Sequence, residues 1–275
     1  MSPTACLRSF ATWIQIWATS THYPACPASS WKPSKEKYNT MVDVVRARDT
    51  EDLVAQAASK FIEVVEAATA NNGTAQVVLT GGGAGIKLLE KLSVDAADLA
   101  WDRIHVFFGD ERNVPVSDSE SNEGQAREAL LSKVSIPEAN IHGYGLGDVD
   151  LAEAARAYEA VLDEFAPNGF DLHLLGMGGE GHINSLFPHT DAVKESSAKV
   201  IAVFDSPKPP SERATLTLPA VHSAKRVWLL VSGAEKAEAA AAIVNGEPAV
   251  EWPAAGATGS EETVLFLADD AAGNL

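Results

Sequence analysis

The sequence comprises 275 residues, of which 46% are hydrophobic and 21% are charged, a composition typical of a soluble globular protein with a substantial core. The formal net charge of −17 at pH 7 repels polyphosphate backbones, and because no concentrated basic patch occurs, we expect no binding to nucleic acid. No run approaches the roughly 20 apolar residues of a membrane span, so we expect no association with a membrane.

The first 40 residues differ in character from the rest of the chain. They contain both cysteines, Cys6 and Cys26, so the remainder has no thiol for a disulfide or a thiolate site, which suits a reducing cytoplasm. They also lack a clear hydrophobic period, whereas a regular pattern starts at Met41. We therefore expect residues 1–40 to be a disordered extension or a mis-assigned translation start, residues 41–275 to form a single domain, and the protein to be cytoplasmic.

From Met41 onward, helical and strand patterns alternate along the chain. In chain order we predict a helix at 51–70, a strand at 75–80, a helix at 85–92, a strand at 103–109, helices at 122–133 and 151–165, strands at 170–176, 199–204, 214–218 and 226–232, a helix at 234–246 and a strand at 262–268. This alternation indicates a mainly parallel central sheet with helices on both faces, a doubly wound α/β fold. Ligands of such folds bind at the carboxyl ends of the strands, where four segments carry unusual chemistry.

The first segment is the glycine run in "LTGGGAGI", residues 79–86. Successive glycines between a strand and a helix let backbone N–H groups converge on an anion, and the helix dipole adds to the attraction. The run matches neither common nucleotide-binding motif, because Ile86 occupies the third glycine position of G-x-G-x-x-G and no G-K-[ST] follows. The residues alone leave open both a phosphate-binding loop and a structural turn.

The second segment places Asp110, Glu111 and Arg112 directly after the predicted strand at 103–109. An arginine beside two acids can be a solvated ion cluster. Alternatively, Arg112 presents its forked donors to an anionic or carbonyl oxygen while a carboxylate orients a hydroxyl or a water.

The third segment, "GMGGEGH" at 176–182, ends a strand with Glu180 and His182. A histidine of near-neutral pKa can accept a proton from water, and Glu180 could orient it or stabilise its charge. The alternative is a histidine that satisfies a buried turn. No ligand spacing indicates a metal, and no G-x-S-x-G motif indicates a serine nucleophile.

The fourth segment contains two separated cations, Arg213 before one predicted strand and Lys236 in the first turn of the helix at 234–246. A lysine at a helix start opposes the macrodipole, so a nearby anion explains it better than helix stability does. Solvation at the surface is the alternative.

In chain order these segments resemble one family, with T-G-G-G, then W-D-x-I-x-V-F-F-G-D-E-R-x-V-P and a later S-N, then F-D-L-x-L-L-G-M-G-x-x-G-H-x-x-S-L-F-P, R-x-T-L-T-L-P and S-G-x-x-K-A. Over residues 42–270 the chain is similar to the 6-phosphogluconolactonases. The resemblance implies hydrolysis of 6-phospho-D-glucono-1,5-lactone to 6-phospho-D-gluconate in the oxidative pentose phosphate pathway, without metal or cofactor. It also implies a fold related to glucosamine-6-phosphate deaminases and ribose-5-phosphate isomerases.

The resemblance also implies roles for individual residues. His182 would be the base, assisted by Asp110 and Arg112 as further catalytic residues. The substrate-binding residues, including the phosphate ligands, would be Thr80, Gly81, Gly82, Gly83, Glu111, Glu180, Arg213 and Lys236. Relatives carry Asp before the Gly-His pair and Thr-Ala after it, whereas this chain has Glu180 and Ile183-Asn184, which leaves the geometric role of position 180 open.

Two alternative functions follow from the same resemblance. A glucosamine-6-phosphate deaminase or isomerase would need a glutamate soon after the Gly-His pair, and the "SLFP" found here contains no acid. A non-catalytic sugar-phosphate sensor would carry a DNA-binding module, for which residues 1–40 are too short and too weakly basic. We therefore expect a lactonase whose partner is a small sugar-phosphate lactone, and a chain that is a monomer or a weak homo-oligomer.

Overall fold

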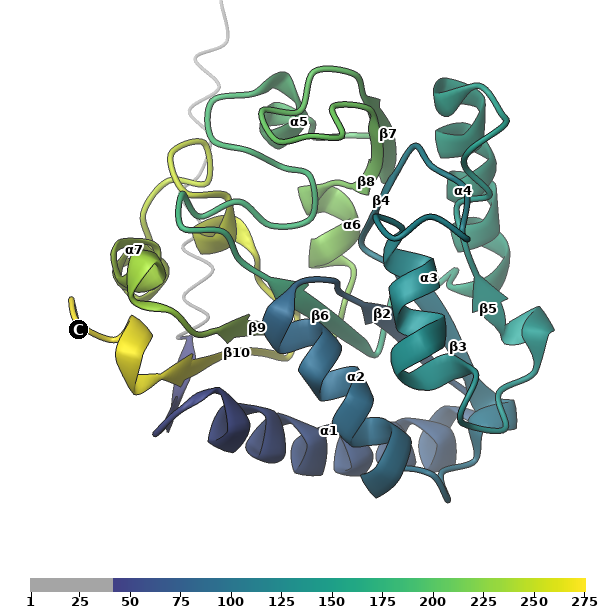
Figure 1. Ribbon diagram of the computed structural model, residues 1–275, viewed down its shortest axis with the longest axis horizontal. Helices are drawn as coiled ribbons and strands as arrows, with labels where there is room; N and C mark the ends of the chain where they lie inside the picture. The colour runs from purple at the N-terminus through teal and green to yellow at the C-terminus, as the bar shows by residue number, and fades with distance from the viewer. Residues whose placement is uncertain (1–41) are drawn as a thin grey trace, which may run out of the picture. The chain divides into compact units, whose positions relative to one another are not determined.

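A parallel sheet of seven strands forms the centre of the computed structural model, which describes residues 42–275 (Figure 1). The extension expected at 1–40 and both cysteines lie outside the described residues. The strand order is β1 (Asp43–Ala47), β10 (Glu262–Ala268), β9 (Arg226–Val231), β6 (Leu172–Gly176), β2 (Ala75–Leu79), β3 (Ile104–Phe108) and β5 (Ile141–His142). All neighbouring strands of this sheet are parallel, which confirms the predicted central sheet.

A second sheet contains three antiparallel strands in the order β4 (Asp110–Arg112), β8 (Arg213–Leu216) and β7 (Val200–Val203). The sequence predicts β7 and β8 as strands but not their separation from the central sheet, and it assigns β4 to a polar loop. The register pairs Arg112 with Arg213 and Asp110 with Thr215. This pairing brings two of the predicted site segments together.

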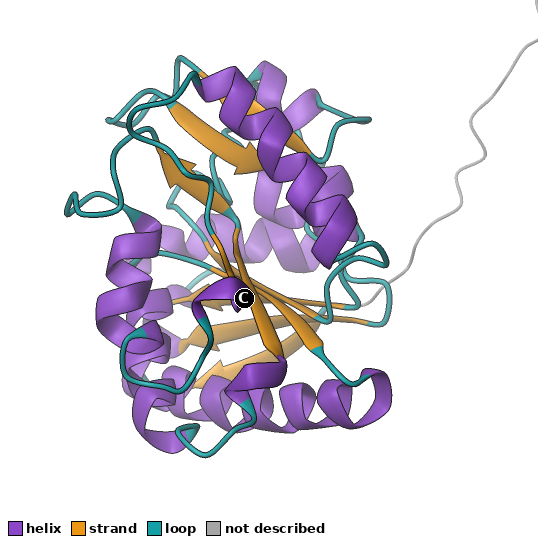
Figure 2. Cartoon of the chain, turned by 90° about the vertical axis from the view of Figure 1, so that its right-hand side faces the viewer, coloured by secondary structure: helices purple, strands orange, loops and turns teal. Residues whose placement is uncertain are grey.

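Helices lie on both sides of the central sheet (Figure 2), as the apolar strands require. They are α1 (Thr50–Asn72), α2 (Gly83–Asp95), α3 (Asn122–Ala126), α4 (Leu151–Phe165), α5 (Asp191–Lys194), α6 (Leu218–His222) and α7 (Ala237–Asn245). Short turns complete them: η1 (Trp101–Arg103), the π-helical η2 (Arg127–Leu131), η3 (Glu138–Asn140), η4 (Ala234–Lys236), η5 (Pro253–Gly256) and η6 (Asp269–Ala271). In residues 42–275 no helix has both the length and the apolar character to cross a membrane.

The observed boundaries follow local sequence signals in most elements. α1 begins after Asp49, whose side chain accepts a hydrogen bond from the backbone N–H of Asp52, and it ends at Gly73 with a φ of 84°. The predicted helix at 151–165 and the predicted strand at 262–268 match α4 and β10. The strand at the sheet edge, β1, was not predicted, because its residues are mainly exposed and form no buried apolar run.

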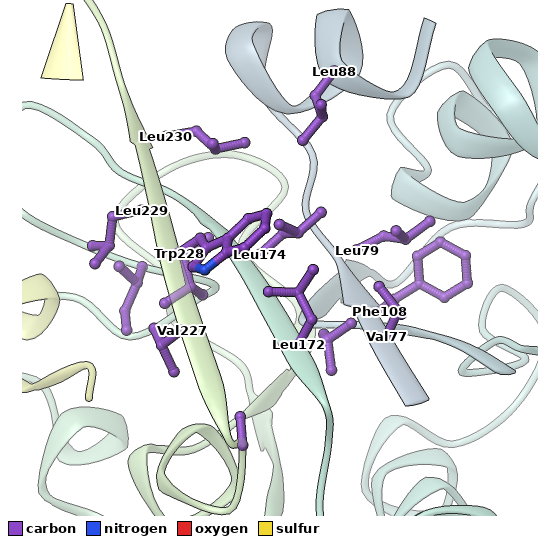
Figure 3. Close-up of a cluster of buried hydrophobic side chains, with 14 of the residues drawn as sticks. Val77, Leu79, Leu88, Phe108, Leu172, Leu174, Val227, Trp228, Leu229 and Leu230 are labelled. Carbon is purple, nitrogen blue, oxygen red and sulfur yellow. The ribbon is translucent and has the colours of Figure 1, made fainter. Parts of the chain in front are cut away.

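The core lies on the central strands of the parallel sheet (Figure 3). Side chains of β2, β6 and β9 meet there beneath Leu88 of α2, and the fully buried ones include Val77, Leu172, Leu174, Val227, Trp228 and Leu229. Burial of each such side chain contributes about 1.5–3 kcal/mol. The strands are therefore firmly held, and their carboxyl ends provide a stable base for the segments that follow them.

The chain reverses its direction of travel across the sheet between β2 and β6. It adds β3 and β5 on one side of β2, and then β9 and β10 on the far side of β6. β2 and β6 pair in register at Val77 with Leu172 and Val78 with His173, and beyond these residues the Gly176 N–H bonds the Thr80 hydroxyl. A crevice outside the carboxyl ends of strands at such a reversal is the usual ligand site of open α/β sheets.

His173, in the middle of β6, is fully buried. Among the described residues neither of its ring nitrogens has a hydrogen-bond partner, and its ring meets Phe170 edge-on with centroids 5.8 Å apart. Burial lowers the pKa of His173 to about 3, so the folded protein holds this imidazole neutral at neutral and mildly acidic pH.

We expect His173→Leu to raise the free energy of unfolding at pH 7 by about 1–3 kcal/mol, because an apolar side chain of similar size replaces an unpaired buried polar one. The folded pKa lies below the unfolded value, so the wild type loses stability as pH falls from about 6.5 toward 3 and the unfolded chain takes up a proton. The advantage of the variant should therefore grow in this interval. Urea unfolding of both proteins at pH 7 and pH 5.5 measures the difference in their free energies of unfolding. A variant less stable than the wild type at both pH values would contradict the prediction.

Candidate active site

A pocket of about 210 Å³ lies at the carboxyl ends of β2 and β6, where the strand order reverses. Its lining comprises Thr80, Gly81, Gly82, Asp110, Arg112, Asn122, Gly176, Met177, Gly178, His182, Asn184 and Arg213. The structure thus brings together seven residues that the sequence nominates from four separate segments, namely Thr80, Gly81, Gly82, Asp110, Arg112, His182 and Arg213. Gly83, Glu111, Glu180 and Lys236 do not line it.

The glycine loop forms one wall of the pocket at the start of α2. Gly82 precedes the helix with a φ of 79°, a left-handed conformation that glycine adopts without strain, and no side chain caps the first turn. The Thr80 hydroxyl accepts a hydrogen bond from the Gly176 backbone N–H at 2.9 Å, which ties the loop to the end of β6. The uncapped N–H groups and the helix dipole make this wall suitable for an anion.

Asn122 holds Asp110 and Arg112 in place on the adjoining wall. Its Nδ2 donates to the Asp110 carbonyl at 2.8 Å and to Asp110 Oδ1 at 2.9 Å, and its Oδ1 accepts from Arg112 NH1. The other carboxylate oxygen of Asp110 accepts from Ser185 Oγ at 2.6 Å. Sequence reasoning did not select Asn122 as a site residue, although the S-N element after G-D-E-R was the available signal.

Glu111 lies behind this wall and is buried. Its carboxylate accepts hydrogen bonds from the backbone N–H groups of Asn122 and Glu123, each at 2.8 Å, and from Ser121 Oγ at 3.0 Å. Burial raises its pKa despite these donors. In this arrangement Glu111 holds the N-terminus of α3, and with it the side chain of Asn122, so it supports the pocket from outside the lining.

His182 faces the pocket with 19% of its side chain exposed. Its ring stacks on Phe187 at a centroid distance of 4.4 Å, and its Nδ1 lies 3.2 Å from Glu180 Oε1. Burial lowers the pKa of His182 and the Lys208 ammonium lowers it further, against the opposing charges of Glu180 and Asp110. The imidazole is therefore neutral at pH 7, as a general base requires.

Glu180 Oε1 lies beside one nitrogen of the ring, Nδ1. Partial burial alone would raise the pKa of Glu180, but the hydrogen bond from Lys208, its own backbone N–H and the charge that His182 carries at low pH outweigh burial and bring the pKa to about 2. An ionised carboxylate accepts hydrogen bonds only, so we assign the proton of the neutral ring to Nδ1. Nε2 then keeps its lone pair.

Gly178 allows the acid and the imidazole to pack this closely. A Cβ atom at this position would overlap the His182 ring and the Glu180 carboxylate. The second glycine of "GMG" is thus required by the close approach of these two side chains.

Arg213 is buried between the small sheet and the turn after β6. Its Nε donates to the Pro210 carbonyl at 2.9 Å, and its NH2 donates to the carbonyls of Lys208 and Pro209 at 3.0 and 3.2 Å. Its NH1 lies 3.8 Å from Asp110 Oδ2. One edge of the guanidinium therefore holds the segment after β7, and the other lies toward the pocket.

Four further residues complete the description of the site. Lys236 ends η4, is partly buried, and forms no ion pair with another described residue; the Glu235 carbonyl of the same turn approaches Gly179. Asn184 has a φ of 48°, and its Nδ2 has no partner within the described part of the chain.

Residues 42–275 contain no group of three or more His, Cys, Asp or Glu side chains arranged for a metal ion.

Sequence comparisons agree with the motifs. A family model described as glucosamine-6-phosphate isomerases/6-phosphogluconolactonase matches residues 48–266. A Mycobacterium tuberculosis protein named 6-phosphogluconolactonase is 51% identical over 236 residues, which cover 82% of this chain and 96% of that protein. A protein of the same name from Streptomyces coelicolor is 41% identical over 239 residues, covering 82% of this chain and 91% of that protein.

Solved structures with the same fold include 6-phosphogluconolactonase from Thermotoga maritima, with a TM-score of 0.75 and 29% identity over 83% of this chain and 100% of that chain. The 6-phosphogluconolactonase from Trypanosoma brucei has a TM-score of 0.75 and 26% identity, and the match covers 85% of this chain and 98% of that chain. A monomeric glucosamine-6-phosphate deaminase shares the fold, with a TM-score of 0.73 at 22% identity. The chain therefore belongs to the family of glucosamine-6-phosphate isomerases and 6-phosphogluconolactonases, and within it to the 6-phosphogluconolactonases.

Proposed function

We propose that the protein hydrolyses 6-phospho-D-glucono-1,5-lactone to 6-phospho-D-gluconate, with His182 as the base that activates water. The observation that carries the proposal is the imidazole of His182, with Glu180 Oε1 3.2 Å from its Nδ1, in the same pocket as an uncapped helix N-terminus. The names of the similar proteins support the same substrate. A cytoplasmic location, expected from the sequence, belongs to this proposal.

The chemistry requires one group that accepts a proton from water and one hydrogen-bond donor that stabilises the developing oxyanion. Nε2 of His182 takes a proton from water as the water oxygen bonds to the C1 carbonyl, and Arg112 meets the developing negative charge on the carbonyl oxygen. The bond from C1 to the ring oxygen then breaks, and the imidazolium returns the proton to the leaving oxygen. A general base contributes roughly 10²- to 10⁴-fold and one oxyanion donor about 10²- to 10³-fold.

The phosphate would bind away from the reacting carbonyl and orient it. The first turn of α2 supplies backbone N–H groups beside Thr80, and we propose that Lys236 adds a positive charge. Three of the five N–H groups of Arg213 are used by loop carbonyls, and its Nη1 donates to Ser185 Oγ at 3.4 Å, so the remaining N–H of Nη1 is the part available to the substrate. Binding energy from this remote group fixes the lactone for attack.

A coupled assay with freshly generated 6-phosphogluconolactone tests the function directly. We expect 6-phosphogluconate to form well above the spontaneous rate. Glucosamine 6-phosphate, offered in parallel, should release no ammonia. Ammonia release without lactone hydrolysis would show that the protein is a deaminase instead.

The role of His182 predicts that His182→Asn lowers kcat by at least about 10²-fold with little change in KM, because the variant loses the base but keeps the phosphate site. His189→Asn is a matched control, since His189 is exposed and does not line the pocket. Steady-state kinetics on both variants decide the point, and an unchanged kcat for His182→Asn would remove His182 from the mechanism.

The phosphate assignment predicts that Lys236→Met raises KM by about tenfold or more while kcat stays within a few-fold, because a charged contact remote from the carbonyl is lost. Lys133→Met, at an exposed lysine outside the pocket, should leave both constants unchanged. If KM of Lys236→Met equals that of the wild type, Lys236 is not a phosphate ligand.

A further inference from the structure

Lys208 lies in the segment between β7 and β8 and contacts both Glu180 and His182. It does not itself line the pocket. Its Nζ lies 2.7 Å from Glu180 Oε1 and 3.5 Å from His182 Nδ1. The same ammonium lies 5.8 Å from the ring centre of Phe187, on which the imidazole stacks. It therefore lies where the acid, the imidazole and the aromatic ring meet.

The backbone of Lys208 is held in place by a buried residue. Arg213 donates from NH2 to the Lys208 carbonyl at 3.0 Å and to the Pro209 carbonyl at 3.2 Å. The segment also closes on itself through the Ser206 N–H and the Ser211 carbonyl at 3.0 Å. The lysine thus starts from a fixed backbone position, although 47% of its side chain is exposed.

We propose that Lys208 is a positioning residue for the general base, which holds Glu180 against Nδ1 of His182 and disfavours a second proton on the resting ring. The proposal rests on the proposed function of His182 as base. It explains why Glu180 suits this chain in place of the shorter Asp of its relatives. Oε1 of Glu180 contacts both the Lys208 ammonium and the His182 imidazole.

The charges around His182 give this proposal its direction. Glu180 from the same turn and Asp110 from β4 both favour a protonated ring, and Lys208 opposes them. Without the ammonium, no cation would lie beside Nδ1 to oppose the two carboxylates, and Glu180 would lose the hydrogen bond that it accepts from Lys208. Both changes raise the pKa of His182.

The same ammonium also affects the second half of the reaction. Once His182 has taken a proton from water, an imidazolium lies beside the Lys208 ammonium. Repulsion between the two cations favours transfer of that proton to the leaving ring oxygen, which restores the neutral base. Lys208 would therefore assist both steps without touching the substrate.

The test compares Lys208→Met, which removes the charge but keeps most of the stem, with Lys208→Arg, which keeps the charge. The apparent pKa of the acid limb of kcat/KM against pH should move upward by at least roughly half a pH unit in Lys208→Met and stay near the wild-type value in Lys208→Arg. Lys194→Met is the matched control, because Lys194 is a similarly exposed, ion-paired lysine outside the pocket and should leave the limb unmoved.

A second measurement separates this inference from the proposed function. The NMR titration of the His182 ring, assigned with His182→Asn, should show the same upward shift in Lys208→Met without any substrate. Failure of the wild type to hydrolyse the lactone would refute the proposed function, while the titration would still report on Lys208. An unmoved His182 titration in Lys208→Met, or an equal shift in Lys194→Met, would overturn the role of Lys208.

Discussion

The neighbouring positions of β2 and β6, at the point where the strand order reverses, are the constraint on which the site depends. The two strands share only two residue pairs in register, and the hydrogen bond from the Gly176 N–H to the Thr80 hydroxyl then links the segments that leave them. One segment becomes the glycine loop and the start of α2, and the other becomes the turn that carries His182. The glycine loop and His182 therefore line the same pocket, because they follow neighbouring strands where the strand order reverses.

The small antiparallel sheet supplies the second constraint. It places β4 beside β8, so that Asp110 and Arg112 reach the pocket from one strand and Arg213 from the other. Each charged group there is held by specific partners: Asn122 and Ser185 bind Asp110, and loop carbonyls bind Arg213. Such fixed donors and acceptors stabilise charge without reorganising during a reaction.

The local electrostatics differ from those of the chain as a whole. A protein with a formal net charge of −17 repels an anionic ligand at long range, so the attraction must come from nearby groups. Arg112 and Arg213 line the pocket, and Lys208 lies behind His182. Arg213 is buried. Its interactions with charged groups are therefore stronger, because buried charges are screened less by solvent and salt.

The sequence by itself determined the long helices and most of the buried strands, but not β1 or β4, because apolar period and glycine content are local properties. The chemistry at the strand ends, with His182, Asp110 and the glycine loop, was singled out in the same way. Only the tertiary structure decided the partners. Lys208 meets His182 across 26 positions and Ser185 meets Asp110 across 75, and no local pattern encodes such contacts. Likewise, adjacent acids look equivalent in sequence, but burial makes Glu111 a support of α3 and leaves Asp110 at the pocket.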